Sequence, residues 1–222
     1  ESETFEAMKT LTPLLEKISV ERTFVEFDKL LLAPHWRVGL SSMIASKAYD
    51  YLPDMAGSQG KLQSLFDLKD NFTFESSEQA CAALLWVLKV EDAQKFLKHW
   101  KTSRQFAKQV QDLLTILSLR EKGELSKRDC YRFDLDLILQ AENLRRAQGK
   151  EVNPQAITET YESLTIHDKK EMQINGGILI KEYGYQPGPE LGDVLEEIEY
   201  AIVDGELEND RQAIHDYLRE RK

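Results

Sequence analysis

Two pairs of side chains in this 222-residue sequence could carry metal-dependent chemistry, and the first is Asp134 with Asp136. Two carboxylates at positions i and i+2 hold a divalent cation together when both project from one face of a strand. The residues around Asp134 show helical periodicity, in which positions i and i+2 diverge by about 200°. We therefore expect no metal site at this pair.

The second pair, His167 and Asp168, has the residue types of the metal-binding dyad in HD phosphohydrolases. Such a site needs further histidines from other helices, and the remaining ones, His35, His99 and His215, lack an accompanying His/Asp pattern. The sequence also lacks phosphate-binding Gly-rich loops and a Gly-x-Ser-x-Gly nucleophile motif. We predict no catalytic residue, no metal ligand and no bound cofactor in this chain.

Cys81 and Cys130 lie in apolar helical patterns without metal-type spacing, so we expect reduced, buried thiols. Apolar stretches such as residues 80–90 are too short to cross a bilayer, and the acidic N-terminus is unlike a signal peptide. We therefore expect a cytoplasmic protein with no membrane partner. Glu1 is not a start methionine, and we expect a processed chain or a piece of a longer one.

Basic residues are concentrated in the middle of an acidic sequence. The net charge is −10, from 29 Lys and Arg against 39 Asp and Glu, yet residues 95–150 carry 13 against 7. Several of these cations recur at helical spacing and could form a stripe that contacts RNA phosphates. The candidates are Lys98, Lys101, Arg104, Lys108, Arg128, Arg132, Arg145 and Arg146. An ordinary solvated helix face remains the alternative interpretation.

No aromatic side chains are interleaved with this basic stripe, because Phe96, Trp100 and Phe106 are expected to pack inward. Contacts without base stacking suit recognition of phosphates and duplex shape rather than of base sequence. We expect no DNA partner.

The periodicity is helical from end to end, and an all-α fold is predicted. Serine, asparagine and proline at expected helix starts, and glycine at expected ends, mark the boundaries. The expected helices are 20–32 after a Ser19 cap, 35–51, 78–90, 103–119, 126–148, one opening at Asn153-Pro154, a hairpin through residues 175–205, and one capped by Asn209.

The hairpin has a turn stiffened by proline, with one helix ending at Gly184 and the next opening at Pro189. Residues 190–210 contain nine carboxylates and no lysine or arginine before Arg211, so this face should repel phosphate. Any RNA contact there should come from the backbone at Gly188 and Gly192, where a helix N-terminus can hold an anion. Glu190 weakens that expectation, and a helix hairpin with a purely structural role is the alternative.

Two stretches at opposite ends of the chain resemble bacterial CCA-adding tRNA nucleotidyltransferases. Residues 175–195 and 205–211 look like the C-terminal tail of that family. Near the start, residues 3–9 and the run Ile18-Ser19-Val20-Glu21-Arg22, continued to residue 31, resemble its neck, where an Ile-Ser-x-Glu-Arg-x-x-x-Glu-Phe helix follows the catalytic head. Residues 33–170 show no signature of their own.

The resemblance implies a helical neck and body array with a C-terminal helical-hairpin tail, lacking the catalytic head. It implies domains at 1–60, 61–150 and 151–222. Glu21 and Arg22 would brace the neck against the head, although a first-turn glutamate and an Arg22–Glu26 pair explain the same residues. The chain would be a monomer that holds the tRNA acceptor stem and T-arm. The absent head would use Mg²⁺ with CTP and ATP. Alone it would be inactive.

Three alternatives remain open at this point. A poly(A) polymerase of the same superfamily would share these features. An acidic helical protein-interaction module would have no RNA role. An HD-type hydrolase would depend on His167.

Overall fold

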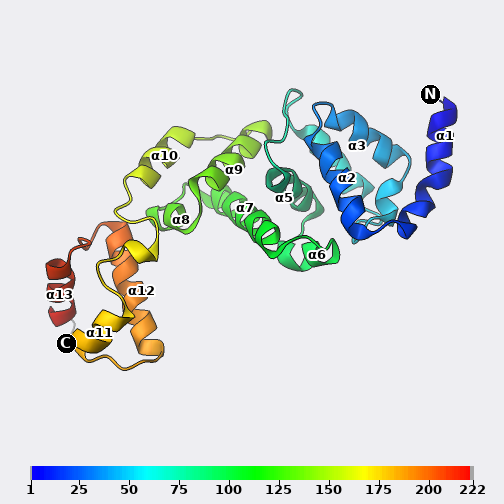
Figure 1. Cartoon of the computed structure of the whole chain (residues 1–222). Coiled ribbons are helices and arrows are strands. Elements are labelled where there is room, and N and C mark those ends of the chain that lie inside the picture. Colours follow the sequence, from blue (N-terminus) through cyan, green and yellow to red (C-terminus); the bar gives the residue numbers. More distant parts are fainter. Residues whose placement is uncertain (1, 221–222) are drawn as a thin grey trace. The chain divides into compact units, whose positions relative to one another are not determined.

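The computed structural model describes residues 2–220, and every regular element among them is a helix, as predicted (Figure 1). The chain divides into two compact units, each built from two stretches of sequence. Unit 1 comprises residues 1–122 and 136–152, and unit 2 comprises residues 123–135 and 153–222. The chain passes from unit 1 to unit 2 for the last time after residue 152, close to the predicted boundary between residues 150 and 151. The division into three domains stays a prediction.

Unit 1 is an array of short helices around the buried helix α5. Its elements are α1 (Ser2–Leu11), the 3-10 helix η1 (Thr12–Lys17), α2 (Val20–Leu32), α3 (Trp36–Ala45), η2 (Ala48–Tyr51), α4 (Gln59–Gln63), η3 (Ser64–Asp67), α5 (Ser77–Leu88), α6 (Ala93–His99), α7 (Arg104–Lys122) and α9 (Leu135–Ala147), whose first residue belongs to unit 2.

The Ser19 cap predicted for α2 is confirmed, and α5 begins after a Ser76 cap. Ser19 Oγ accepts a hydrogen bond from the Arg22 backbone N–H at 3.4 Å, and Ser76 Oγ accepts one from the Gln79 N–H at 3.0 Å. Each satisfies a backbone donor that the first helical turn leaves without an intrahelical partner. Helix α5 packs against both α2 and α7, so its short, apolar side chains form the centre of the unit.

The helix predicted over residues 35–51 is interrupted. Lys47 adopts a left-handed conformation (φ 59°), so α3 ends at Ala45 and η2 begins at Ala48. Ser46 favours this break, because its hydroxyl donates to the Met43 carbonyl at 3.2 Å and competes with the helical ladder. The break buries Tyr49 together with Ile44.

The helix predicted over residues 126–148 is also two helices. Helix α8 (Lys127–Arg132) begins at a Ser126 capping box and ends at Phe133, whose backbone is extended and whose ring is buried. The sequence had suggested that Asp134 lies within a helix. Instead it lies in the break that precedes α9. The capping interactions of Ser126 and Asp129 determine where α8 begins, and the burial of Phe133 determines where it ends.

Unit 2 combines α8 with α10 (Pro154–Glu162), η4 (Lys169–Glu171), α11 (Gly176–Tyr183), α12 (Pro189–Asp204) and α13 (Arg211–Glu220). The predicted hairpin is confirmed, since Gly184 ends α11 at φ 78° and Pro189 opens α12. Its apolar core runs from Cys130 to Leu218 and includes Val194, Ile198 and Ile202.

The start of α13 differs from the prediction. Asp210 Oδ1, not Asn209, accepts from the Gln212 and Ala213 N–H groups, at 2.8 and 3.2 Å. The Asn209 side chain instead binds backbone groups of Gln173 and Glu171, at 2.9 Å each. Asn209 thus ties the loop after η4 to the start of α13.

Both cysteines are free and buried, as expected. Among residues 2–220, no helix is both long and apolar enough to span a membrane.

Candidate functional site

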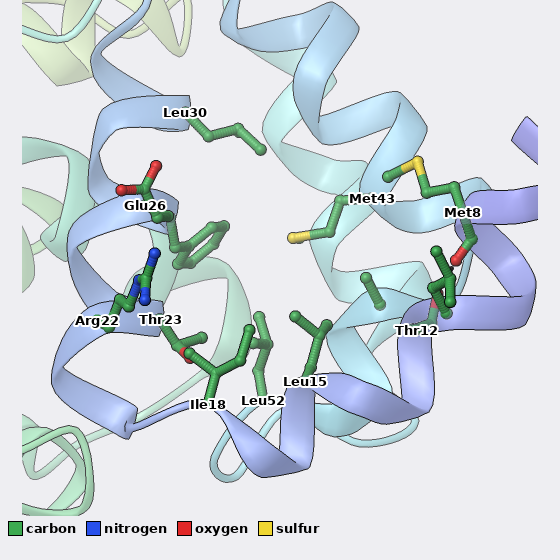
Figure 2. A pocket seen from close by; sticks show the side chains of 13 residues that line it. Met8, Thr12, Leu15, Ile18, Arg22, Thr23, Glu26, Leu30, Met43 and Leu52 are labelled. Carbon is green, nitrogen blue, oxygen red and sulfur yellow. Dashed lines mark hydrogen bonds between the residues drawn. The ribbon is translucent and has the colours of Figure 1, made fainter. Parts of the chain in front are cut away.

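An open apolar groove is lined by α1, η1 and α2 on one side and by residues of α3 and η2 on the other (Figure 2). Its volume is about 670 Å³, and Leu15, Phe27, Leu30 and Met43 contribute to its walls. Met8, Leu11 and Ile18 also line it, although their side chains are 40%, 56% and 42% exposed. Exposed apolar side chains gathered on one surface are typical of a contact with another body of protein.

The two residues at the centre of the predicted neck motif lie at the start of the helix that forms one wall of this groove. Arg22 lines the groove beside Glu26 (Figure 2). Glu26 forms its ion pair with Lys29 at 3.0 Å rather than with Arg22, the alternative partner expected from the sequence.

Glu21 makes a connection that the sequence did not suggest. Its Oε1 lies 3.2 Å from Lys101 Nζ, in the turn between α6 and α7. The pKa of Glu21 is lowered, first by a hydrogen bond from its own backbone N–H at the helix start and then by Lys101. The neck motif and the predicted basic region are thereby joined within unit 1.

The four cations of residues 98–108 are exposed, but they do not form a stripe along one helix. Lys98 belongs to α6, Lys101 lies in the turn with φ 52°, and Arg104 and Lys108 belong to α7. The chain turns here because Trp100 enters the core, where it is 2% exposed. Lys108 Nζ pairs with Asp112 Oδ2 at 2.5 Å.

The aromatic residues of this region pack inward, as predicted. The Trp100 ring lies 6.0 Å from the rings of Phe24 and Phe27 and 6.4 Å from that of Phe96. Phe106 is half-buried against Phe24, with ring centroids 5.5 Å apart.

Arg128 and Arg132 lie on α8 in unit 2. The Arg128 guanidinium binds both carboxylate oxygens of Asp204 and lies 4.7 Å from the Tyr200 ring centroid. The hydrogen bond to Asp204 is the main cause of a raised pKa at Arg128. Arg132 is exposed, with its guanidinium 5.1 Å from the Phe133 ring.

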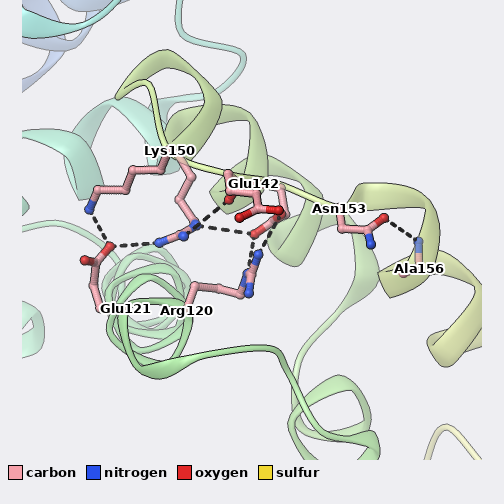
Figure 3. A network of polar contacts seen from close by, with 8 residues as sticks. Arg120, Glu121, Glu142, Lys150, Asn153 and Ala156 are labelled. Atoms are coloured by element: carbon pink, nitrogen blue, oxygen red, sulfur yellow. Dashed lines mark hydrogen bonds and ion pairs between the residues drawn. The ribbon is translucent and has the colours of Figure 1, made fainter.

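Arg145 belongs to an ion-pair network between α7 and α9. Figure 3 shows its partners Glu121 and Glu142 within this network. Its Nη1 lies 2.8 Å from Glu121 Oε1, Lys150 binds the same oxygen, and Arg120 Nε lies 2.7 Å from Glu142 Oε1. The side chains of Arg145 and Glu142 are only 8% and 1% exposed.

This burial corrects the prediction for Arg145, because its guanidinium is enclosed and neutralised within the protein. Its neighbour Arg146 projects to the surface and donates to Asn143 Oδ1 at 3.1 Å. Helical spacing alone did not distinguish the two arginines, since one residue step turns a side chain by about 100°.

Gly188 and Gly192, predicted as backbone contacts, are exposed at the start of α12. A Cβ added at either would meet no heavy atom within 4 Å, so packing does not require glycine at these positions. Gly188 precedes the helix with an extended backbone (φ 162°).

The residues considered for catalysis have local structural partners. Asp168 caps η4 by accepting from the Lys170 N–H at 2.7 Å, His167 Nε2 lies 3.0 Å from the Tyr161 carbonyl oxygen, and Asp136 accepts from Gln140 at 2.7 Å. In the described part of the chain, no group of three or more His, Cys, Asp or Glu side chains is arranged to hold a metal ion.

One surface residue was missed in the sequence. Trp86, near the end of α5, is half-buried and lines a second groove of unit 1 with Lys89 and Lys122. The signal available in the sequence was the position of Trp86, only three residues before Lys89, which ends α5.

Comparison with known proteins gives a consistent result. A family profile described as "tRNA nucleotidyltransferase domain 2 putative" matches residues 72–218, and one described as "Probable RNA and SrmB- binding site of polymerase A" matches residues 1–58. CCA-adding enzymes of Streptococcus pneumoniae (strain ATCC BAA-255 / R6) and Streptococcus sanguinis (strain SK36) are 82% and 56% identical over 222 residues.

The chain spans 56% of the length of these two curated relatives. The crystal structure of the Bacillus stearothermophilus CCA-adding enzyme in complex with CTP superposes with a TM-score of 0.88 at 28% identity. That match covers 98% of this chain and 56% of the other.

Proposed function

Because this chain belongs to the tRNA nucleotidyltransferase family as a fragment of a CCA-adding enzyme, we propose that it is the part that holds the tRNA. It would position the acceptor stem and T-arm so that the 3′ end receives C, C and A. Positioning of this kind lowers the barrier by fixing the reacting groups near one another before reaction.

The chemistry itself would take place in a catalytic head outside this chain. CTP and ATP would be its substrates, and Mg²⁺ would stabilise charge on the phosphoryl group being transferred. The apolar groove at Met8, Leu11 and Ile18 supports a docking place for that head, since these side chains are left exposed here. Arg22, on the groove wall, would contact the head directly.

The observation that carries the proposal is the Glu21–Lys101 ion pair. It joins the helix that forms the groove wall to the turn bearing the exposed cations Lys98, Lys101 and Arg104. A head seated on the groove and an RNA bound by the cations would therefore contact one connected structure. We propose a monomeric, cytoplasmic protein, and light scattering tests the first point.

Binding to a tRNA minihelix and to single-stranded RNA of equal length, measured across salt concentrations, tests this function. We expect preference for the minihelix and an affinity that falls steeply with salt. In the double variant Lys98→Glu and Arg104→Glu the affinity should fall further. Lys29→Glu with Lys47→Glu changes the charge of the same unit equally and should have less effect.

Equal loss in both double variants would indicate attraction by net charge alone, without a defined surface. Failure of the unaltered chain to bind at low salt would contradict the RNA-holding role and favour a protein-interaction module. A poly(A) polymerase would share the groove and the cations, and the nucleotide preference of the full-length enzyme would distinguish it.

A further inference from the structure

A second groove of unit 1 lies between the end of α5 and one face of α7. Its volume is about 620 Å³. Trp86 and Lys89 line it from α5 and its cap, and Leu114, Leu119 and Lys122 from α7. Neither the proposed tRNA contacts nor the apolar groove at α1 includes these residues.

Trp86 is the distinctive member of this groove. The protein has three tryptophans, of which Trp36 and Trp100 are 1% and 2% exposed, whereas Trp86 is half-buried. A tryptophan ring at a groove surface offers a flat face on which a nucleobase can stack, and every base has such a face.

Two lysines line this groove, and a third lies near the Trp86 ring. Lys89 ends α5 in a left-handed conformation and is exposed, and Lys122 is exposed in the last turn of α7. Lys150 Nζ lies 5.8 Å from the Trp86 ring centroid, near the outer limit of a cation–π contact. Its side chain is fixed there by Glu121, within the ion-pair network (Figure 3).

The groove also offers hydrogen-bonding side chains. Thr115 and Ser118 line it along α7, and the edge of a stacked base could meet them, whereas the Gln111 amide is already bound to the backbone at Ala93 and Glu91. Glu91 is the one carboxylate among the lining residues that the structure describes, so lysines outnumber it. Trp86, Val90 and Leu119 are half-buried and supply the apolar surface of the groove, whereas Leu114 is only 6% exposed.

We propose that this groove binds an unpaired nucleotide of the bound RNA, with its base stacked on Trp86 and its phosphate neutralised by Lys89 or Lys122. The inference rests on the proposed tRNA-holding function and adds to it. Contacts by exposed lysines alone would report phosphate position and duplex shape, whereas stacking on Trp86 favours RNA with an unpaired base.

Intrinsic fluorescence tests the inference, because Trp86 is the tryptophan open to a ligand. The full chain is titrated with a minihelix, whose loop and 3′ end are unpaired, and with a blunt duplex of the same stem that has neither. We expect saturable quenching by the first RNA, little by the second, and loss of the quenching signal in Trp86→Phe.

Affinity measurements on matched variants complete the test. Trp86→Leu keeps apolar bulk but removes the stacking face, and it should bind the unpaired minihelix about 5- to 150-fold more weakly, while Trp86→Phe retains most of the affinity. Lys89→Gln and Lys122→Gln should each reduce the salt dependence if they contact phosphate. Circular dichroism verifies that each variant is folded.

The outcomes separate the two proposals. If the minihelix binds but neither Trp86 fluorescence nor the Trp86→Leu affinity changes, the groove is not an RNA site, while the tRNA-holding function stands. Equal quenching by the blunt duplex would overturn the preference for an unpaired nucleotide. If no RNA binds even at low salt, both proposals fail together.

Discussion

The two units of this chain differ in charge far more than in architecture. Both are helical, and each has a buried core. Unit 1 contains 19 lysines and arginines against 20 aspartates and glutamates, whereas unit 2 contains 10 against 19. The net charge of −10 therefore belongs almost entirely to unit 2, and the nearly neutral unit 1 is the better candidate for contact with phosphates.

Unit 1 contains a buried ion pair besides several exposed ones, and unit 2 contains a pair at its surface. Arg120 and Glu142 of unit 1 have side chains that are 9% and 1% exposed, while Arg128 and Asp204 of unit 2 are 53% and 24% exposed. A buried pair is costly to break, because the remaining charge loses its partner in a poorly solvated site. An exposed pair is screened by water and contributes little.

The largest expected effect is protection of the two cysteine thiols, one in each unit, from alkylation. Cys81 is buried in unit 1 and Cys130 in unit 2, so alkylation should be slowed about 1,000-fold or more relative to the unfolded chain. Labelling at increasing urea, followed by mass spectrometry of the two peptides, measures the opening of each unit. Identical urea dependence would contradict separate units and show that they open together.

The same thiols give a pH dependence. Burial raises the pKa of Cys130 to about 11, whereas the pKa of an unfolded cysteine is about 8.5. A raised pKa means that stability is complete below the unfolded value and is lost as pH rises. Unit 2 should therefore lose stability between about pH 8.5 and pH 11, and Cys130→Ala should reduce that loss.

The next largest effect concerns the two ion pairs. Glu142→Gln leaves Arg120 and Arg145 without a buried carboxylate and should lower the free energy of unfolding by about 3–5 kcal/mol. Asp204→Asn, the matched change at the exposed pair, should lower it by only about 0–1 kcal/mol. Urea denaturation measures both, and equal losses would remove this difference between the units.

A smaller effect is expected on RNA binding when cations are reversed in either unit. Lys98→Glu with Arg104→Glu in unit 1 should reduce the slope of log affinity against log salt by about 0.9 for each duplex phosphate that the protein no longer neutralises. Arg128→Glu with Arg132→Glu in unit 2 should reduce it less, because Asp204 already neutralises Arg128. A larger effect in unit 2 would reverse the comparison.

The smallest effect is expected at the start of α12. Gly188→Ala and Gly192→Ala should change stability by no more than about 1 kcal/mol, because a Cβ meets open space at both positions. Thermal unfolding measures the change. A clear loss of RNA affinity in the stable variants would show that the tail turn contacts RNA through its backbone.

Most helix starts could be predicted from the sequence, because caps are local. Ser19, Ser76, Ser126 and Asn153 each bind a backbone N–H within three residues, and that interaction needs no information from elsewhere in the fold. The breaks at Lys47 and Phe133 were missed, because burial of Tyr49 and Phe133 depends on residues distant in sequence.

The candidate site was predicted less completely for the same reason. Lys98 and Arg104 are exposed as the spacing indicated, but the burial of Arg145 depends on Glu121 and Glu142, and only the folded chain brings these together. The Glu21–Lys101 pair joins residues 80 positions apart, and no local pattern indicates such an interaction.

The order of the segments that form the two units has a consequence for synthesis on the ribosome. The chain leaves unit 1 after residue 122, returns at residue 136 and leaves it again after residue 152. Helix α8 therefore emerges before unit 1 is complete, and its partners α10 and α12 emerge only afterwards. During translation, the apolar face of α8 stays exposed until the last third of the chain has been synthesised and can pack against it. A nascent chain stalled before α12 would therefore expose Cys130.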